Sequence, residues 1–199
     1  MPEVHILSGG IDSASVLYRR LVETANEIHV LHVRRDAPTF LPGLAETKAA
    51  REVAVWLAKN ARAFRYHEVV PMQLVGKPCS NTVFASCGFA VGDYIVRNPF
   101  ISTVVQGSNG SPEDQTSESH FRNRYRENIC AAVCDGYAPA PAWVYPHATL
   151  LKREVYQYMP PDLRALCWTC ANPSRDGDRF ATCGACSKCR ELQAAKEAP

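Results

Sequence analysis

The sequence predicts an α/β fold, a doubly wound parallel sheet with a small cysteine-rich subdomain at its C-terminal end. Two observations support this prediction: short β-branched segments alternate with longer segments of helical periodicity, and the composition changes at Pro160. Strands that alternate with helices form right-handed crossovers, which produce a parallel sheet covered on both faces. We therefore expect an α/β domain over residues 1–159 and a subdomain over residues 160–199.

The expected strands are short and rich in β-branched residues. They cover residues 3–7, 27–33, 63–69, 101–106 and 142–145. Between them, apolar residues recur at spacings of three and four, the period of an amphipathic helix. The clearest case is residues 44–61, where Ala45, Ala49, Val53 and Trp56 follow this spacing. Further helices are expected at residues 12–24, 120–134 and 151–158. Residues 80–98 are expected to form a loop followed by a helix, and loops are expected at residues 34–43 and 107–119.

The composition is that of an ordinary globular protein. The 199 residues are 46% hydrophobic and 21% charged, which excludes a largely disordered chain. A net charge of +2 gives no general attraction to nucleic acid or to an anionic membrane. The segment MPEVHILSGG lacks the basic region and the apolar core of a signal peptide, so we expect none, and no apolar segment approaches the roughly 18 residues of a membrane helix. We expect a cytoplasmic protein with no membrane partner, and the sequence carries no strong signal for nucleic-acid binding, although local basic patches are compatible with its charge.

A phosphate-binding turn is expected where the first strand meets the first helix. The segment is SGGIDS, residues 8–13, at the carboxyl end of a parallel strand, where ligands bind in such sheets. Gly9 and Gly10 let main-chain N–H groups approach an anion, and the helix N-terminus adds a positive dipole end. The alternative is an ordinary tight turn in which Asp12 caps the helix.

A metal site is expected near the C-terminus. Cys183, Cys186 and Cys189 follow one another at CxxC spacing, and Cys170 precedes them. Four thiolates in such an arrangement favour a structural Zn²⁺ site with a closed shell, over an iron–sulfur cluster or a redox pair. Cys167 is a fifth candidate, and spacing alone does not choose between it and Cys170.

The SGGIDS segment resembles the SGGxDS signature of the PP-loop ATP pyrophosphatases, which cleave ATP between its α and β phosphates. By this resemblance, Asp12 helps to hold Mg²⁺ beside the phosphates. The adenine would lie at the end of the second strand, near His32 and Val33, held through main-chain groups. The resemblance implies the following set of ATP-binding residues: Leu7, Ser8, Gly9, Gly10, Ile11, Asp12, Ser13, His32, Val33 and Gly107.

Together, the two motifs resemble the 7-cyano-7-deazaguanine synthase family. The matching segments are SGGIDS, TCANP at residues 169–173 and CGACSKC at residues 183–189, and the resemblance implies Cys170 as the fourth zinc ligand. A weaker match, PHATLLKREV at residues 146–155, makes Lys152 a candidate catalytic residue beside Asp12, the alternative being a solvated helix lysine. The family is homodimeric and uses ATP and ammonia to convert the carboxylate of 7-carboxy-7-deazaguanine into an amide and then a nitrile.

The middle of the chain departs from that family. Residues 34–46, 88–97 and 107–119 lack its usual substrate-recognition patterns. A diverged paralogue, such as those found in anti-phage operons, could stop at the amide or deliver the acyl group to another amine, for example on a protein. Two further alternatives are another PP-loop enzyme, such as a tRNA thiolase or amide ligase, and a non-catalytic zinc-knuckle interaction protein.

Arginines provide further candidate ligand contacts. Arg122, Arg124 and Arg126 alternate along an expected helix, which favours a solvated face over a contact with phosphate or carboxylate. Arg34 and Arg35 follow the second strand at the ligand-binding edge of the sheet, and the sequence does not decide whether they contact a ligand or solvent.

Overall fold

A computed structural model of the chain describes residues 1–35, 40–70, 80–110 and 117–197. Residues 36–39 and 111–116, which belong to two of the expected loops, lie outside the described residues.

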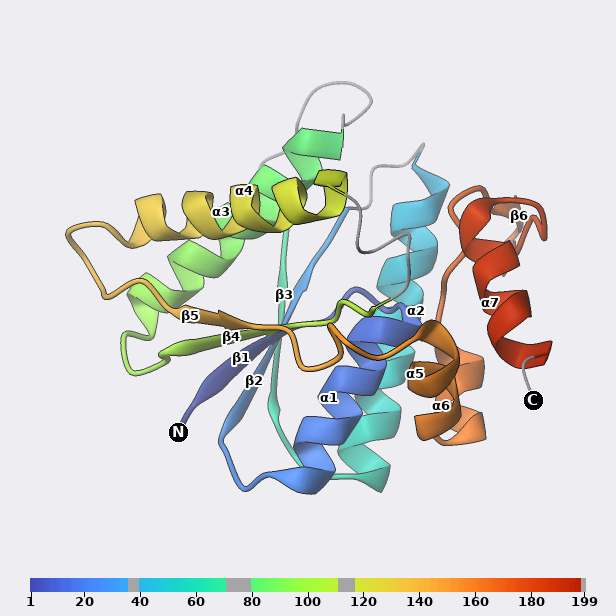
Figure 1. Cartoon of the computed structure of the whole chain (residues 1–199), viewed down its shortest axis with the longest axis horizontal. Helices are drawn as coiled ribbons and strands as arrows, with labels where there is room; N and C mark the ends of the chain where they lie inside the picture. Colours follow the sequence, from blue (N-terminus) through green and yellow to red (C-terminus); the bar gives the residue numbers. More distant parts are fainter. Residues whose placement is uncertain (36–39, 71–79, 111–116, 198–199) are drawn as a thin grey trace.

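Five parallel strands form the central sheet in the order β3-β2-β1-β4-β5 (Figure 1). Their bounds are β1 Glu3–Ile6, β2 Ile28–Val33, β3 Arg65–Val69, β4 Thr103–Gln106 and β5 Ala142–Val144. The central strand β1 pairs with both β2 and β4, so that Val4 lies opposite His29 on one side and Val104 on the other. The chain thus winds outward from β1 in two directions, which confirms the predicted doubly wound parallel sheet.

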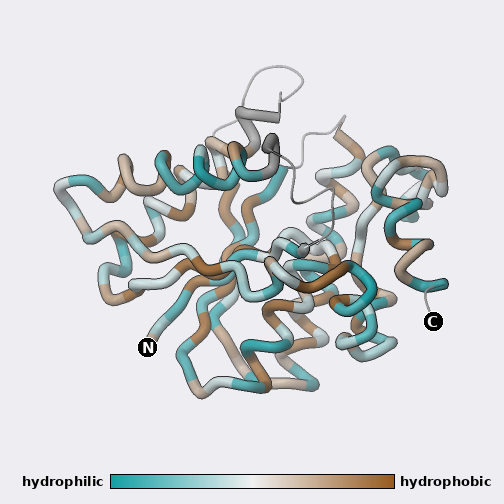
Figure 2. The backbone as a smooth tube through the Cα atoms, in the orientation of Figure 1, coloured by the Kyte–Doolittle hydropathy of each residue, from teal (hydrophilic) through white to brown (hydrophobic). Residues whose placement is uncertain are grey.

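Helices cover both faces of this sheet (Figure 1). One face carries α1 Ile11–Glu23, α2 Leu41–Asn60, α5 Lys152–Tyr158 and α6 Pro161–Leu166, and the other carries α3 Ser80–Arg97 and α4 Ser117–Cys134. Successive side chains of a strand point to opposite faces, and accordingly Val30 packs with the α1 and α2 residues while its neighbour Leu31 packs with those of α3. Hydrophobic residues accordingly concentrate where the helices meet the sheet (Figure 2).

Helices α1 to α5 occur where the periodicity predicts them, but some begin earlier, and the periodicity predicts neither α6 nor the helix at Ser187–Glu197. Helix α2 begins at Leu41 instead of residue 44, because Pro42 occupies its first turn, where a missing N–H and a fixed φ are tolerated. Helix α4 begins at Ser117 instead of residue 120. Helix α5 begins at Lys152, where the main-chain N–H of Leu151 donates to the Glu154 carboxylate at 2.6 Å. None of the helices in the described part of the chain is long and apolar enough to cross a membrane.

The cysteine-rich segment follows α6 and forms a small unit beside α5 (Figure 1). It consists of the hairpin β6 Ser174–Asp176 and β7 Arg179–Ala181, followed by α7 Ser187–Glu197. Leu163 of α6 is fully buried in the same cluster as Val155 and Met159 of the preceding chain. Residues on both sides of position 160 therefore contribute to one hydrophobic core.

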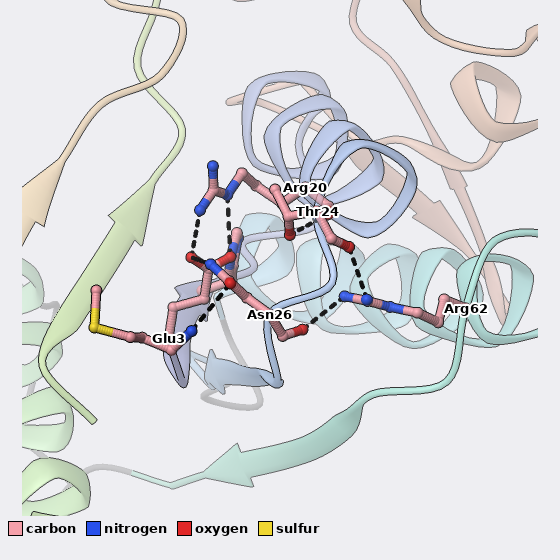
Figure 3. Close-up of polar contacts among 7 residues, drawn as sticks. Glu3, Arg20, Thr24, Asn26 and Arg62 are labelled. Carbon is pink, nitrogen blue, oxygen red and sulfur yellow. Dashed lines mark hydrogen bonds and ion pairs between the residues drawn. The ribbon is translucent and has the colours of Figure 1, made fainter. Parts of the chain in front are cut away.

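An ionic network closes the amino end of β1, the end remote from the SGGIDS turn (Figure 3). The buried Glu3 carboxylate accepts hydrogen bonds from Arg20 (2.6 and 3.0 Å), Asn26 (3.2 Å) and His5 (2.8 Å). Arg62 donates in turn to the main-chain carbonyl of Asn26 at 2.8 Å. Burial raises the pKa of Glu3, but the hydrogen bonds from His5 and Arg20 outweigh it and lower that pKa to about 2. The network joins β1, α1 and the turn before β2 around one ionised carboxylate.

Candidate functional site

A cleft of about 390 Å³ opens at the carboxyl ends of β1 and β4. These two strands are neighbours in the sheet, but their following helices lie on opposite faces, the arrangement at which open α/β sheets bind ligands. The volume lies within the range of small-molecule sites. Residues of the SGGIDS turn line this cleft together with Leu7, Val33 and Gly107.

The SGGIDS turn is held tightly against α2. Gly9 adopts a positive φ of 82°, and a Cβ there would lie 2.5 Å from the Glu46 carbonyl oxygen. Only glycine fits this combination of conformation and contact. The Gly9 carbonyl also accepts a hydrogen bond from the Trp168 N–H at 2.8 Å, which joins the turn to the cysteine-rich segment.

The two serines of the turn preorganise it. The Ser13 hydroxyl donates to the Gly10 carbonyl at 3.0 Å and accepts from the Ser8 N–H at 3.1 Å, while the two serine hydroxyl oxygens lie 2.9 Å apart. Gly10 is the N-cap of α1, and no side chain caps the helix. The alternative role of Asp12 as an N-cap is therefore not observed, and the free N–H groups of the first turn are available for an anion at the cleft.

Asp12 and Lys152, 140 residues apart in the chain, form an ion pair beside the cleft. The Lys152 ammonium donates to Asp12 Oδ2 at 2.5 Å, and the buried Asn109 amide donates to Oδ1 at 2.9 Å. Burial raises the pKa of Asp12, but the Lys152 charge and hydrogen bond outweigh it and hold that pKa below its ordinary value. Lys152 is only 7% exposed, so it is not a solvated helix lysine.

Gly107 brings the end of β4 against α1. A Cβ at this position would lie 2.5 Å from the Ser13 nitrogen and 2.6 Å from the Asp12 carbonyl carbon. The absence of a side chain therefore lets the β4 loop pack directly on the first turn of the helix. This contact places Gln106 and Asn109, on either side of that loop, next to the SGGIDS turn.

His32 and Ile11 support the site from the core. The His32 ring is buried; its Nδ1 lies 2.7 Å from the Leu7 carbonyl oxygen and its Nε2 lies 3.1 Å from the Thr47 hydroxyl. The Ile11 side chain is buried in the hydrophobic cluster beneath α1. Neither residue lines the cleft, whereas the neighbouring Val33 does.

Cationic side chains from three elements line the cleft. Arg122 and Arg126, four residues apart on one face of α4, each place a guanidinium 5.2 Å from the centre of the Phe84 ring. Arg126 is 7% exposed, so the prediction of a solvated face is wrong for this residue, although Arg124 is exposed. The spacing of four could have indicated this shared face.

Arg35 and Lys188 complete the cationic lining. Arg35 is paired with Glu46, whose pKa is raised by burial against the opposing effect of Arg35, and Lys188 comes from α7. Among the described residues of the lining, four cationic side chains thus face two acidic ones, Asp12 and Glu46. This excess of positive charge suits a polyphosphate or a carboxylate. No motif in the sequence marks Glu46, whereas Lys188 lies within the CGACSKC segment, where only the cysteines indicated a function.

The four C-terminal cysteines form one cluster. The sulfur atoms of Cys170, Cys183, Cys186 and Cys189 all lie within 4.8 Å of one another, an arrangement that can hold a metal ion. The Cys183 N–H donates to the Cys170 sulfur at 3.2 Å, and the Cys186 N–H donates to the Cys183 sulfur at 3.3 Å. N–H groups directed at sulfur are suited to stabilising thiolates.

Cys167 lies apart from this cluster. Its thiol packs against the hydrophobic core and donates to the Leu163 carbonyl at 3.5 Å. Burial, with a smaller effect from the Asp12 charge, raises the pKa of Cys167 to about 12. The geometry therefore groups Cys170, and not Cys167, with the other three sulfurs.

The cysteine cluster and the cleft share helix α7. Cys189 and Lys188 are adjacent on this helix, and Glu191 lies 4.0 Å from the Lys152 ammonium. With the Trp168 bond to Gly9, these contacts connect the cluster to both sides of the SGGIDS turn.

In comparisons with known proteins, no family model matches the chain and no curated protein matches its sequence. A solved structure with a similar fold is the U34-tRNA thiolase NcsA from Methanococcus maripaludis with its [4Fe-4S] cluster, at a TM-score of 0.51 and 13% identity. The alignment covers 98% of this chain and 63% of that chain, so this chain spans less than two thirds of the thiolase. At this identity, the similarity shows a shared α/β fold.

Proposed function

We propose that the chain is an ATP-dependent carbon–nitrogen ligase that adenylates the carboxylate of 7-carboxy-7-deazaguanine or a related deazapurine. The observation that supports this most directly is the cleft, where the SGGIDS turn, the uncapped start of α1 and four cationic side chains meet. The likeness of the SGGIDS and CGACSKC segments to the 7-cyano-7-deazaguanine synthases suggests the substrate. The fold shared with a tRNA thiolase agrees with a PP-loop enzyme.

The first step forms an acyl adenylate. A carboxylate oxygen of the substrate attacks the α-phosphorus of ATP, and pyrophosphate leaves with the electron pair of the broken P–O bond. The N–H groups of the turn and the arginines would stabilise the developing charge on the phosphates. Each Asp12 oxygen keeps a lone pair beyond its bond to Asn109 or Lys152, so Asp12 can contact Mg²⁺ without losing either partner.

The second step replaces AMP by nitrogen. Ammonia attacks the acyl carbon, AMP leaves, and a proton is lost to give the amide. Activation of the amide oxygen by a second ATP would permit its elimination and give the nitrile, 7-cyano-7-deazaguanine. An amine on a protein could replace ammonia, in which case the product would be a conjugate. The expected localisation in the cytoplasm and the homodimer belong to the same proposal.

We also propose that the cysteine cluster holds one Zn²⁺ with a structural role. Sulfurs at about 2.3 Å from one tetrahedral ion lie roughly 3.8 Å apart, which is compatible with mutual distances within 4.8 Å. Sulfurs bound to four different irons of a cluster must lie farther apart. Four cysteine ligands fill a tetrahedral shell, so no open position remains for catalysis.

Product analysis tests the ligase proposal. The purified chain is incubated with Mg-ATP and 7-carboxy-7-deazaguanine, with and without ammonium, and AMP and the deazapurine are followed by mass spectrometry. AMP together with a nitrile or an amide supports the proposal and distinguishes the two products. AMP with a deazapurine adenylate that ammonium does not consume points to another amine. No AMP in any mixture contradicts the proposed substrate.

A matched pair of variants tests the site. Asp12→Ala should reduce AMP formation by at least 100-fold, because the metal contact and the partner of Lys152 are both lost. Asp93→Ala, on the exposed end of α3, is the control and should retain full activity. AMP formation that survives Asp12→Ala would show that the chemistry lies elsewhere.

A tRNA thiolase is the second candidate, favoured by the similarity to NcsA. Iron and sulfide in the purified protein, with thiolation of an added tRNA, would support it. One zinc per chain and no iron would favour the ligase.

A further inference from the structure

A short chain of hydrogen bonds fixes the side-chain orientations on the α4 side of the cleft. The Arg126 guanidinium donates to Asn123 Oδ1 at 3.0 Å, and Gln106 Nε2 donates to the same oxygen at 3.2 Å. Because a guanidinium can only donate, Asn123 must present its oxygen to Arg126. Gln106 must therefore present its NH₂ group to Asn123, and the Gln106 oxygen points away from this pair.

Within this hydrogen-bonded group, two buried polar atoms have no hydrogen-bond partner among the residues that the structure describes. Gln106 Oε1 and Arg126 Nε are both shielded from solvent, and both residues are 7% exposed. Both residues line the cleft. A buried unpaired acceptor and a buried unpaired donor are each destabilising, so the two atoms point to a ligand that would satisfy them.

The position of these atoms relates them to the phosphate-binding turn. Gln106 directly precedes Gly107, which packs on the first turn of α1. Phe84 forms part of the cleft wall, and the Arg122 and Arg126 guanidinium groups each lie 5.2 Å from the centre of its ring. A planar ligand against this wall would lie next to a phosphate held by the turn.

The ligand must donate a hydrogen bond to Gln106 Oε1 and accept one from Arg126 Nε, which limits the chemical classes that can bind. A triphosphate offers only acceptors at neutral pH, so it leaves the Gln106 oxygen unpaired. The adenine base is neutral, so it would not supply a negative charge beside the buried Arg126 guanidinium. A planar heterocycle that carries both a ring N–H and a carboxylate satisfies the acceptor, the donor and the charge.

We propose that Phe84, Gln106, Asn123 and Arg126 form the subsite for the acyl substrate, a planar heterocyclic carboxylate whose ring N–H donates to Gln106 and whose oxygen accepts from Arg126. This assignment rests on the proposed function and adds the residues that select the substrate. Bound there, the carboxylate lies beside the turn at which ATP is proposed to present its α-phosphate.

A ligand series on the unaltered protein tests the subsite. Isothermal titration without ATP compares 7-carboxy-7-deazaguanine with two analogues: the carboxamide, which lacks the charge, and the O6-methyl ether, which lacks the N1–H of the six-membered ring, the donor assigned to Gln106, and keeps the pyrrole N–H. Each analogue should bind about tenfold more weakly or worse, because one buried polar atom stays unpaired. Equal affinities for all three compounds would overturn the proposal.

A matched pair of variants assigns the effect to Gln106. Gln106→Met keeps the length of the side chain and removes the acceptor, whereas Arg124→Met changes an exposed residue of α4, the helix that carries Asn123 and Arg126. Gln106→Met should weaken binding of the carboxylate about tenfold and leave the affinity for ATP within about twofold. Arg124→Met should change neither. If Gln106→Met weakens ATP instead, the residue contacts adenine and the proposal is overturned.

Failure of this proposal can be separated from failure of the proposed function. If 7-carboxy-7-deazaguanine binds with the expected pattern but yields no AMP, the subsite stands and the ligase chemistry fails. If AMP forms and Gln106→Met leaves carboxylate binding unchanged, the ligase stands and the subsite is wrong.

Discussion

At the scale of single residues, Asp12 shows how a carboxylate stays ionised in a largely buried place. Its burial disfavours the charge, and the Lys152 ammonium at 2.5 Å together with the Asn109 amide at 2.9 Å compensates. The same ion pair joins α1 to the start of α5. Its two members are therefore expected to depend on each other for stability.

Replacement of Lys152 tests this dependence. Lys152→Met leaves the Asp12 charge without its cation and should lower the free energy of unfolding by roughly 2–4 kcal/mol, measured in urea at pH 7. Addition of Asp12→Asn should restore part of this loss, because the unpaired charge is gone. The control Lys59→Met lies on an exposed turn of α2 and should cost less than about 0.5 kcal/mol. Strictly additive effects of the two substitutions would contradict the coupling.

At the scale of elements, the Glu3 network ties β1 to α1 and gives stability a defined pH dependence. The pKa of Glu3 lies at about 2 in the folded chain, against an ordinary value of 4.5. Because the folded-state pKa is the lower one, the stabilisation is complete above pH 4.5 and is lost as the pH falls towards 2. The difference corresponds to about 3 kcal/mol at neutral pH.

The variant Glu3→Gln isolates this contribution. The unfolding free energy of the unaltered chain should exceed that of the variant by about 3 kcal/mol at pH 7, and the excess should shrink to roughly 1 kcal/mol by pH 3. Guanidinium denaturation at several pH values measures both curves. An excess that stays constant between pH 7 and pH 3 would mean that Glu3 titrates normally in the folded chain.

The cysteine cluster allows a second test at this scale. Cys170→Ser removes one of four clustered sulfurs and should lower the metal content well below one ion per chain, with a fall in the melting temperature. Cys167→Ser changes the neighbouring thiol that bonds to the Leu163 carbonyl and should keep the metal. Elemental analysis of both purified variants measures the content. Metal loss in Cys167→Ser and retention in Cys170→Ser would reverse the assignment.

Loss of a metal from the cysteine cluster should also weaken ligand binding at the cleft. Helix α7 carries Lys188 at the cleft and Glu191 near Lys152, and Trp168 bonds to Gly9. A chelator that removes the metal should therefore weaken ATP binding as well as lower the melting temperature.

At the scale of the whole molecule, one core spans the boundary expected at residue 160. Leu163 packs with Val155 and Met159, and Leu192 of α7 contacts the same cluster. We therefore expect the chain to unfold in one cooperative transition.

Leu163→Ala tests this expectation. The substitution should lower the free energy of unfolding by about 2–5 kcal/mol and shift the single calorimetric transition as a whole. The control Val22→Ala truncates a side chain that is 50% exposed on α1 and should have a small effect. Two transitions, of which only one responds to Leu163→Ala, would show that residues 160–199 unfold independently.

The sequence by itself determined the local features of this protein. Hydrophobic periodicity predicted the five strands and most helices, and the glycines of the SGGIDS segment predicted a tight turn, because these properties depend on residues close in the chain. The CxxC spacing likewise predicted that Cys183, Cys186 and Cys189 cluster. It could not decide between Cys170 and Cys167, since that choice depends on where the fold places each thiol.

Only the tertiary structure decided which distant residues meet. In the folded chain Lys152 forms an ion pair with Asp12, and the His32 side chain is buried in the core. Arg126 is also buried and lines the cleft, although the sequence favoured a solvated position for it. The tertiary structure also brought Gln106, Asn123 and Phe84 to one wall, although no motif marks them. The physical reason is that these contacts depend on the order of strands in the sheet and on the packing of helices against it, and both are set by interactions across the whole chain.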